Sequence, residues 1–279
     1  MTKFVFFGTD NFATTVLDEL KTLGLQPELI ITTPDKPQGR KMQLTPPPVK
    51  VWAQTNNIPY IQPENLKAGP ENLLTEPTCD LALVASYGKI LPQALLDIPR
   101  LGFVNIHPSL IPKYRGATPL ESAILSGDTE TGVTLLQVDA EMDHGPILAQ
   151  EKIALTNQDY FALRDQTARL GAQLFARILP DFVAGKIRGT EQDHATATFT
   201  KKITKTDGEI DLASDPTQNF RKIRAYADWP GTYFFIEKGG QKIRVLIKKA
   251  HLEDKELIID RVLPEGKKEI PWETFKTQN

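Results

Sequence analysis

An asparagine and a histidine stand two positions apart at the start of segment 105–116, which reads Asn-Ile-His-Pro-Ser-Leu-Ile-Pro-Lys-Tyr-Arg-Gly. The run before it, 101–104, has the composition of a strand end, so strand alternation places Asn105 and His107 on one face. An amide donates hydrogen bonds, and an imidazole moves a proton near neutral pH. Two prolines and a glycine exclude a helix and leave a loop. The pattern predicts chemistry on a carbonyl group, with one side chain for the oxygen and one for the proton.

An isolated Asn-x-His is more often a turn or an ordinary polar pair than a catalytic site, so the length of the match decides its meaning. The whole segment resembles the signature loop of the folate-dependent formyltransferases, Asn-x-His-x-Ser-Leu-Leu-Pro-x-x-Arg-Gly, with Ile111 in place of the second leucine. Residues 132–145 resemble the second motif of that family, in which Asp143 matches a catalytic carboxylate. The opening of the chain resembles the family's Phe-x-Gly-Thr-x-x-Phe-Ala through Phe6, Gly8, Thr9, Phe12 and Ala13.

The resemblance implies formyl transfer from 10-formyltetrahydrofolate to an amine, without a covalent enzyme intermediate. Asn105 would donate to the oxyanion, and His107 would bind the developing charge, relay protons, or both. Asp143 would orient His107 and fix its tautomer. The resemblance also implies a set of folate-binding residues in three loops: Ser86, Tyr87, Gly88, Lys89, Ile90, Leu91, Ser109, Leu110, Ile111, Pro112 and Asp139. For Ile90 and Leu91, simple core packing is an equally good explanation.

Three segments are similar to the branch of the family that formylates methionyl initiator tRNA. The basic segment 33–41 resembles an insertion used against the tRNA acceptor end, although its prolines and glycine also suit a plain surface loop. Residues 207–211 resemble the entry into the C-terminal domain. Residues 223–232 resemble the element Ile-Arg-Ala-x-x-Pro-Trp-Pro-Gly, with Asp228 replacing the usual proline. The residues expected to bind tRNA phosphates are Arg40, Lys41, Lys201, Lys202, Lys248 and Lys249.

Other functions share these motifs. A sugar-nucleotide formyltransferase would use the same triad and the same donor, and a hydrolase of 10-formyltetrahydrofolate would use water as acceptor. A non-catalytic tRNA-binding protein could keep the fold, but the presence of all three triad residues speaks against it. After Ala250 the chain passes almost directly into 257–268, so we expect a shortened C-terminal barrel. This shortening leaves room for the sugar-nucleotide reading.

Composition narrows the class of protein. The 279 residues are enough for a large domain with a small second one, and the single cysteine, Cys79, excludes an internal disulfide. The four histidines are not spaced as metal ligands, so we expect no metal. We found no signal peptide and no apolar run of membrane length, and we expect a cytoplasmic monomer without a membrane partner. Residues 200–279 hold 16 Lys and Arg against 13 Asp and Glu, which permits a polyanionic partner without establishing one.

Strand-like and helix-like segments alternate through the first half. Strands are expected at 3–7, 27–32, 58–61, 81–85 and 102–106, with a helix from Thr9 or Asp10 to Leu23 and another opened by prolines 46–48. This order predicts an α/β fold, a Rossmann-like parallel sheet covered by helices. A nicotinamide cofactor is rejected, because Gly8 stands alone where the dinucleotide fingerprint needs three glycines. Two further strands, 134–137 and 147–154, precede a long helix from Tyr160 that should end near Pro180.

The last part of the chain changes character. Short β runs at 232–237, 243–249 and 257–262, with Gly239 and Gly240 between the first two, predict a hairpin and a small β-rich domain. A helix at 219–227 should lead into this domain, which we expect to be OB-like, a partial barrel. The predicted organisation is a formyltransferase catalytic domain at 1–188, a linker at 189–206 and a C-terminal β-rich domain at 207–279.

Overall fold

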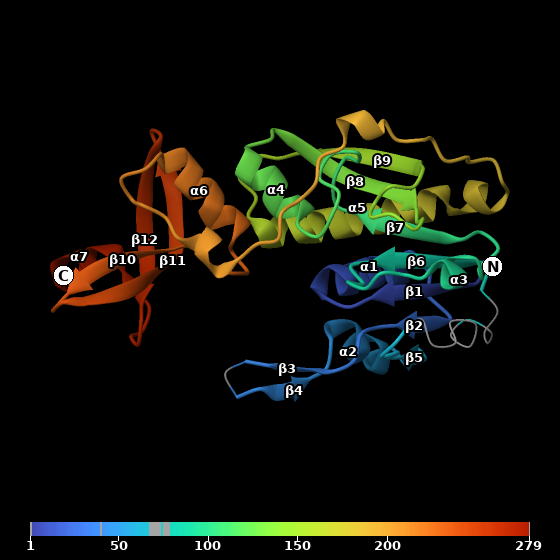
Figure 1. Cartoon of the computed structure of the whole chain (residues 1–279), viewed down its shortest axis with the longest axis horizontal. Helices are drawn as coiled ribbons and strands as arrows, with labels where there is room; N and C mark the ends of the chain where they lie inside the picture. Colours follow the sequence, from blue (N-terminus) through green and yellow to red (C-terminus); the bar gives the residue numbers. More distant parts are fainter. Residues whose placement is uncertain (1, 40, 67–73, 75–78, 279) are drawn as a thin grey trace. The chain divides into compact units, whose positions relative to one another are not determined.

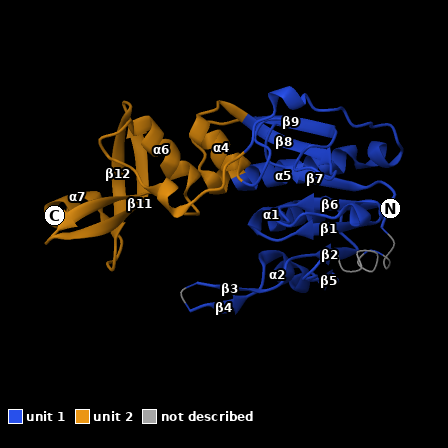
Figure 2. Ribbon diagram, viewed as in Figure 1, with its two compact units in different colours: residues 1–117, 131–153, 164–199 blue, residues 118–130, 154–163, 200–279 orange. Residues whose placement is uncertain are grey.

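The computed structural model describes residues 2–39, 41–66, 74 and 79–278. The chain forms two compact units, which Figure 2 shows in different colours. The first comprises 1–117, 131–153 and 164–199, and the second 118–130, 154–163 and 200–279. The last break between the units, between 199 and 200, falls within the linker predicted at 189–206. Two segments of the predicted catalytic domain, 118–130 and 154–163, belong to the second unit.

A seven-stranded sheet forms the first unit, in the order β5-β2-β1-β6-β7-β8-β9 (Figure 1). Its strands are β1 (Phe4–Gly8), β2 (Leu29–Ile31), β5 (Tyr60–Ile61), β6 (Leu81–Ala85), β7 (Phe103–His107), β8 (Glu130–Gln137) and β9 (Ile147–Ala154). The five strands from β5 to β7 are parallel, whereas β8 is antiparallel to β7. The Rossmann-like α/β prediction is confirmed, with the correction that the sheet is mixed. Side-chain alternation has the same period in both directions, so the sequence pattern did not reveal this reversal.

Both faces of this sheet are buried, which explains the unbroken apolar runs of β1 and β6. Helices α1 (Asn11–Thr22), α2 (Pro48–Thr55) and α5 (Tyr160–Val183) contribute to the core on one face. The other face packs against the short helix α3 (Gln93–Leu96) and the loop before it. Val104 and Ile106 of β7 belong to the first core and Phe103 to the second. The same alternation directs Asn105 and His107 to the α3 side.

Helix α1 begins where the sequence predicts. The Asp10 carboxylate caps it by accepting from the backbone N–H groups of Phe12 (3.0 Å) and Ala13 (3.3 Å). Gly8 lets the helix approach β1 and β6 closely, because a Cβ on Gly8 would lie 2.7 Å from that of Ala13 and 2.9 Å from the Ala85 carbonyl oxygen. The packing of helix on sheet therefore depends on the first glycine of the chain.

The predicted end of the long helix near Pro180 is wrong. Helix α5 continues through Pro180 to Val183. A proline removes one backbone hydrogen bond, but the last turn is held by Leu179 and Phe182, which are buried in the core of the first unit. Tertiary packing thus overrides the local signal.

The second unit contains a four-stranded antiparallel sheet, which confirms the β-rich C-terminal domain. Its strands are β10 (Tyr233–Lys238), β11 (Gln241–Glu253), β12 (Glu256–Pro264) and β13 (Ile270–Pro271). Gly239 and Gly240 form the predicted hairpin turn, both at positive φ. Register shifts on either side of Lys249 mark irregularities in β11, of the kind that curve a strand.

Helices complete the two units. In the second, α4 (Pro119–Ser126) packs against α6 (Pro216–Ala225), and α7 (Trp272–Gln278) packs against the sheet. In the first, β3 (Lys36–Gln38) and β4 (Gln43–Thr45) form a separate hairpin whose β3 side chains are all exposed. The short 3-10 turns η2 (His194–Thr196) and η3 (Lys205–Gly208) lie within or beside the predicted linker. Within the described ranges, no helix combines the length and apolar character needed to cross a bilayer.

Candidate active site

The end of β7 carries Asn105 and His107 on one side of a central strand. Asn105 lies opposite Val84 of β6 and Leu136 of β8 in the two neighbouring ladders. His107 is 4% exposed and pairs in register with Thr134. A side chain on a paired central strand is held more rigidly than one on a free loop. The amide and the imidazole therefore have fixed directions.

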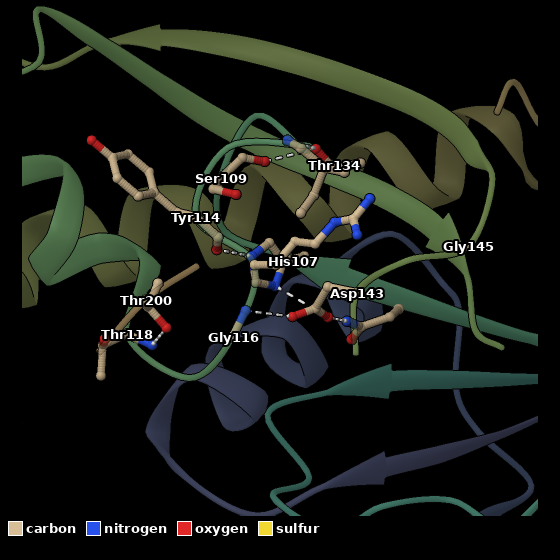
Figure 3. Close-up of polar contacts among 12 residues, drawn as sticks. His107, Ser109, Tyr114, Gly116, Thr118, Thr134, Asp143, Gly145 and Thr200 are labelled. Atoms are coloured by element: carbon tan, nitrogen blue, oxygen red, sulfur yellow. Dashed lines mark hydrogen bonds and ion pairs between the residues drawn. The ribbon is translucent and has the colours of Figure 1, made fainter. Parts of the chain in front are cut away.

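Asp143 joins this pair from the loop between β8 and β9 (Figure 3). Its Oδ1 accepts from Asn105 Nδ2 at 3.2 Å, and its Oδ2 accepts from the Gly116 N–H at 2.8 Å. Oδ1 also lies 3.6 Å from His107 Nδ1, an ion-pair distance that is too long for a hydrogen bond. The side chains of His107 and Asp143 are 5% and 13% exposed, so water screens their interaction only weakly. The structure thus brings together the three residues singled out in the sequence.

The other ring nitrogen of His107 is committed to the backbone. His107 Nε2 lies 2.9 Å from the Tyr114 carbonyl oxygen (Figure 3). A carbonyl oxygen only accepts, so Nε2 is the nitrogen that carries a hydrogen, and Nδ1 is the nitrogen that faces Asp143. The family resemblance implies that Asp143 fixes the tautomer, whereas in the structure the Tyr114 carbonyl does so from the opposite side of the ring.

A second layer of polar side chains, which sequence reasoning missed, lies behind Asp143. Gln192 donates from Nε2 to the carbonyl oxygens of Asp143 (2.9 Å) and Gly145 (2.7 Å). Its Oε1 accepts from the guanidinium of Arg115, which also bonds His194 Nδ1 at 2.8 Å. Arg115 belongs to the signature loop and so had a sequence signal. Gln192 and His194 fall in a stretch without apolar periodicity and had none.

The loop 86–91 follows β6 at the carboxyl edge of the parallel strands, where such sheets bind ligands. Ser86 and Gly88 both have positive φ, and the Ser86 hydroxyl donates to Asp10. Burial raises the pKa of that Asp10 carboxyl, against the lowering effect of the bond from Ser86. Lys89 Nζ donates a hydrogen bond to the Pro63 carbonyl oxygen at 2.8 Å. These hydrogen bonds to Asp10 and Pro63 hold the loop 86–91 in its conformation.

Core packing accounts for some of the predicted folate residues and not for others. Tyr87 and Leu91 are buried in the core on the α3 side, whereas Ile90 is 88% exposed. In the signature loop, the buried Ser109 donates to the Lys113 carbonyl at 2.6 Å. Ile111 is likewise buried, and its N–H donates to Thr134 Oγ1 at 3.1 Å. The remaining members, Leu110 and Pro112, are partly exposed.

Asp139 is tied to the same polar network. Its Oδ2 lies 2.7 Å from His144 Nδ1. The His144 ring stacks on His194, with the ring centroids 4.1 Å apart and the planes within 5°. Since His194 contacts Arg115, a continuous set of polar contacts leads from Asp139 to the signature loop. In the described part of the chain, no group of three or more His, Cys, Asp or Glu could hold a metal ion.

Comparison with known proteins identifies the family. The sequence model of the family described as formyl transferase matches residues 2–179, and that of the formyl transferase C-terminal domain matches 202–258. The chain belongs to the formyl transferase family. A methionyl-tRNA formyltransferase of Chloroflexus aggregans is 44% identical over 249 residues, which cover 88% of this chain and 79% of that protein. One from Listeria monocytogenes is 38% identical over 299 residues, covering 99% and 96%.

Solved structures agree on the fold. A 4-N formyltransferase from Francisella tularensis superposes with a TM-score of 0.66 at 23% identity, over 90% of this chain and 99% of that one. A methionyl-tRNA formyltransferase from Clostridium thermocellum gives 0.62 at 16% identity, over 95% and 99%. At such identities the likeness establishes the architecture alone.

The lysines predicted to bind tRNA are on the surface of this family member. Lys41 is exposed in the turn of the β3–β4 hairpin, while Arg40 lies outside the described residues. The base of the hairpin is fixed by Asp35, which accepts from Lys50 Nζ (2.8 Å) and Gln62 Nε2 (2.7 Å). The bonds from Gln62 and Lys50 hold the pKa of Asp35 below its ordinary value. In the second unit the exposed predicted lysines are Lys201, Lys202, Lys248 and Lys249.

Proposed function

We propose that this chain transfers the formyl group of 10-formyltetrahydrofolate to the α-amino group of methionine on initiator tRNA, which gives N-formylmethionyl-tRNA for translation initiation. The observation that carries the proposal is the convergence of Asn105, His107 and Asp143 at one edge of the sheet. Identities of 44% and 38% to methionyl-tRNA formyltransferases support the choice of acceptor. A sugar 3N-formyl transferase is 18% identical to the chain, a likeness that shows the fold alone.

Asn105 would stabilise the oxygen of the reacting carbonyl. Its amide nitrogen carries two hydrogens, and one of them is given to Asp143 Oδ1. The second is available for an oxygen that becomes negative during transfer. One such preorganised donor is typically worth about 3 kcal/mol of transition-state stabilisation.

His107 and Asp143 would handle the proton of the attacking amine. The Nδ1 atom of His107 accepts this proton, because Nε2 is held by the Tyr114 carbonyl. The imidazolium then returns the proton to the folate nitrogen as the bond between that nitrogen and the formyl carbon breaks. The resulting imidazolium faces the Asp143 carboxylate across 3.6 Å in a nearly buried site, where the opposite charge stabilises it. The Gly116 N–H and Asn105 keep that carboxylate in place.

The loops around the triad suit a flat, partly apolar donor. Ile90 is 88% exposed in the loop after β6, and Met142 is 57% exposed beside Asp143. Exposed apolar side chains at a ligand-binding edge of a sheet favour a ring system that covers them. We assign the predicted folate residues to this role, and the donor when bound supplies the formyl group. The exposed lysines would hold tRNA through its phosphates, and we expect the chain to act as a monomer.

A competition between acceptors tests the proposal. The protein is incubated with formyl-labelled 10-formyltetrahydrofolate and with methionyl initiator tRNA, an aminosugar nucleotide, or buffer alone. We expect label on the tRNA. Label on the sugar nucleotide would establish the rival transferase, and release of formate without an acceptor would establish a hydrolase.

Variants of the triad test the chemistry within the same assay. Asn105→Ala and His107→Ala should each lower kcat at least about 100-fold with the fold intact. His251→Ala is the matched control, because His251 Nδ1 also lies near a carboxylate, that of Asp260 at 3.1 Å, but on the surface of the second unit. Near-normal turnover of either triad variant would reject the assigned roles.

A further inference from the structure

Residues 190–199 connect the two loops that carry the triad. At one end, Thr190 and Ile147 exchange two backbone hydrogen bonds of 2.8 Å at the start of β9. At the other end, the Thr198 N–H donates to the Pro112 carbonyl (3.1 Å), and its carbonyl accepts from the Arg115 N–H (2.8 Å). Because Asp143 lies just before Ile147, this strap (residues 190–199) is bonded both next to the Asp143 loop and to the signature loop.

Gln192 lies in the strap and uses its whole hydrogen-bonding capacity. Both Nε2 hydrogens go to carbonyl oxygens, those of Asp143 and Gly145. Oε1 accepts two bonds, from Nε and Nη2 of Arg115. Gln192 is 5% exposed and Arg115 4%. An arginine only donates and a carbonyl only accepts, so these partners fix the orientation of the Gln192 amide. No other side chain of this length offers both two donor hydrogens and an acceptor oxygen in this arrangement.

The far end of the strap acts on His107. The peptide unit between Tyr114 and Arg115 bonds in two directions: its carbonyl accepts from His107 Nε2 at 2.9 Å, and its N–H donates to the Thr198 carbonyl at 2.8 Å. The Tyr114 N–H also donates to Thr198 Oγ1 at 2.8 Å. A planar peptide cannot turn toward His107 at one end without moving at the other. Thr198 therefore helps to fix the ring.

Both anchored residues have a backbone conformation that needs such support. Asp143 has φ of 51° and Tyr114 φ of 63°, in the left-handed region that L residues other than glycine rarely adopt. Hydrogen bonds from outside the two loops help to hold such a conformation. The strap supplies bonds of this kind to both.

We propose that the strap belongs to the catalytic apparatus and that Gln192 is a positioning residue, which sets the direction of the Asp143 carboxylate toward His107. This inference rests on the proposed function for its kinetic consequences. Gln192 touches no reacting atom, and we assign its main effect on catalysis to its bond with the Asp143 backbone. A segment expected from its sequence to be a linker would thus determine how the proton is received.

Kinetics test this coupling. Gln192→Met keeps the volume and removes every hydrogen bond, and it should lower kcat about 10- to 100-fold with KM for both substrates within about twofold. In an Asp143→Ala background the same substitution should have almost no further effect, since the residue through which it acts is gone. Gln173→Met is the control, because Gln173 loses a comparable bond, to Glu19 Oε1 at 2.8 Å, on helix α5. An equal loss in both backgrounds would show a merely structural role and overturn the inference.

A spectroscopic readout separates this inference from the proposed function. Titration of the His107 imidazole by NMR, with His107→Gln for assignment, needs no turnover. Gln192→Met should displace the His107 titration in the same direction as Asp143→Ala does, while circular dichroism confirms that the variant is folded. An unchanged titration in Gln192→Met would overturn the positioning role even in an active enzyme. Absence of formyl transfer by the unaltered protein, with a displaced titration, would reject only the proposed function.

Discussion

Glu121→Gln tests how a buried carboxyl group changes the stability of the second unit. Glu121 is the carboxyl group of that unit whose pKa burial raises most clearly. Glu121 lies in the first turn of α4, which packs against α6. Burial is the main cause that raises the pKa of its carboxyl from 4.5 to about 7, and the negative charge of Asp228 adds to it. Folding therefore favours the protonated form of Glu121.

The direction of the effect follows from proton binding. The folded chain binds this proton more tightly than the unfolded chain, so stability falls as pH rises between the two pKa values. The contribution is fully present below pH 4.5 and is lost as pH rises through about 7. The two pKa values, 4.5 and about 7, differ by about 2.5 units. At about 1.4 kcal/mol per unit, the largest possible effect on the free energy of unfolding is about 3.5 kcal/mol. Glutamine mimics the protonated acid, so Glu121→Gln should stabilise the second unit by up to about this amount at pH 8 and hardly at all at pH 4.5.

Tryptophan fluorescence makes the measurement specific. Three tryptophans are present, and in a Trp52→Phe background the remaining two, Trp229 and Trp272, belong to the second unit. Urea unfolding at pH 4.5 and pH 8 compares Glu121→Gln with the same background, and the midpoint at pH 8 should rise by about 1 M or more. Glu256→Gln, at an exposed position in β12, is the control and should change little. Equal midpoints at pH 8, or the same gain at both pH values, would refute the reasoning.

Three further results are expected. Gly145→Ala should lower the stability of the protein by about 1–3 kcal/mol and should also lower kcat, because the new Cβ would lie 2.0 Å from the Gln137 carbonyl oxygen and displace the loop of Asp143. Thermal unfolding measures the first effect and turnover the second, and normal values of both would contradict this prediction. Burial raises the pKa of the Cys79 thiol to about 11. Iodoacetamide at pH 8 should therefore alkylate Cys79 at least about 100-fold more slowly than free cysteine, and a rate close to that of free cysteine would show an accessible thiolate. Lys41→Ala should weaken tRNA binding and reduce the slope of log affinity against log salt concentration by about 1. Lys186→Ala, at a lysine outside the predicted tRNA-binding residues, should leave both unchanged. Equal slopes for Lys41→Ala and the unaltered protein would exclude a phosphate contact at Lys41.

Local patterns were enough to predict most strands and the position of Asn105 and His107. The strand β6 follows from an apolar run of five residues, and the placement of Asn105 and His107 follows from strand alternation. The capping of α1 by Asp10 rests on contacts within three residues along the chain. Such features depend on near neighbours, so sequence reasoning reaches them directly.

Features that depend on distant parts of the chain were missed or mistaken. Helix α5 passes Pro180 because buried residues of its last turn pack into the core. The reversal of β8 is set by its pairing with β7 and leaves no mark on the alternation. Helix α4 was not predicted, although Pro119 at its first turn and Gly127 at its end suit a helix, because eight residues give a weak periodic signal.

The sequence by itself determined the family, the α/β architecture and the three residues that we propose as a catalytic triad, because each depends on residue types at fixed spacings along the chain. Tertiary structure alone decided how these residues are held. Gln192 meets Asp143 across 49 positions of sequence, and Thr198 meets Tyr114 across 84. A hydrogen bond depends on distance and direction in space, and folding sets both through packing that no local pattern records. The orientation of His107 and Asp143 is therefore a property of the folded chain.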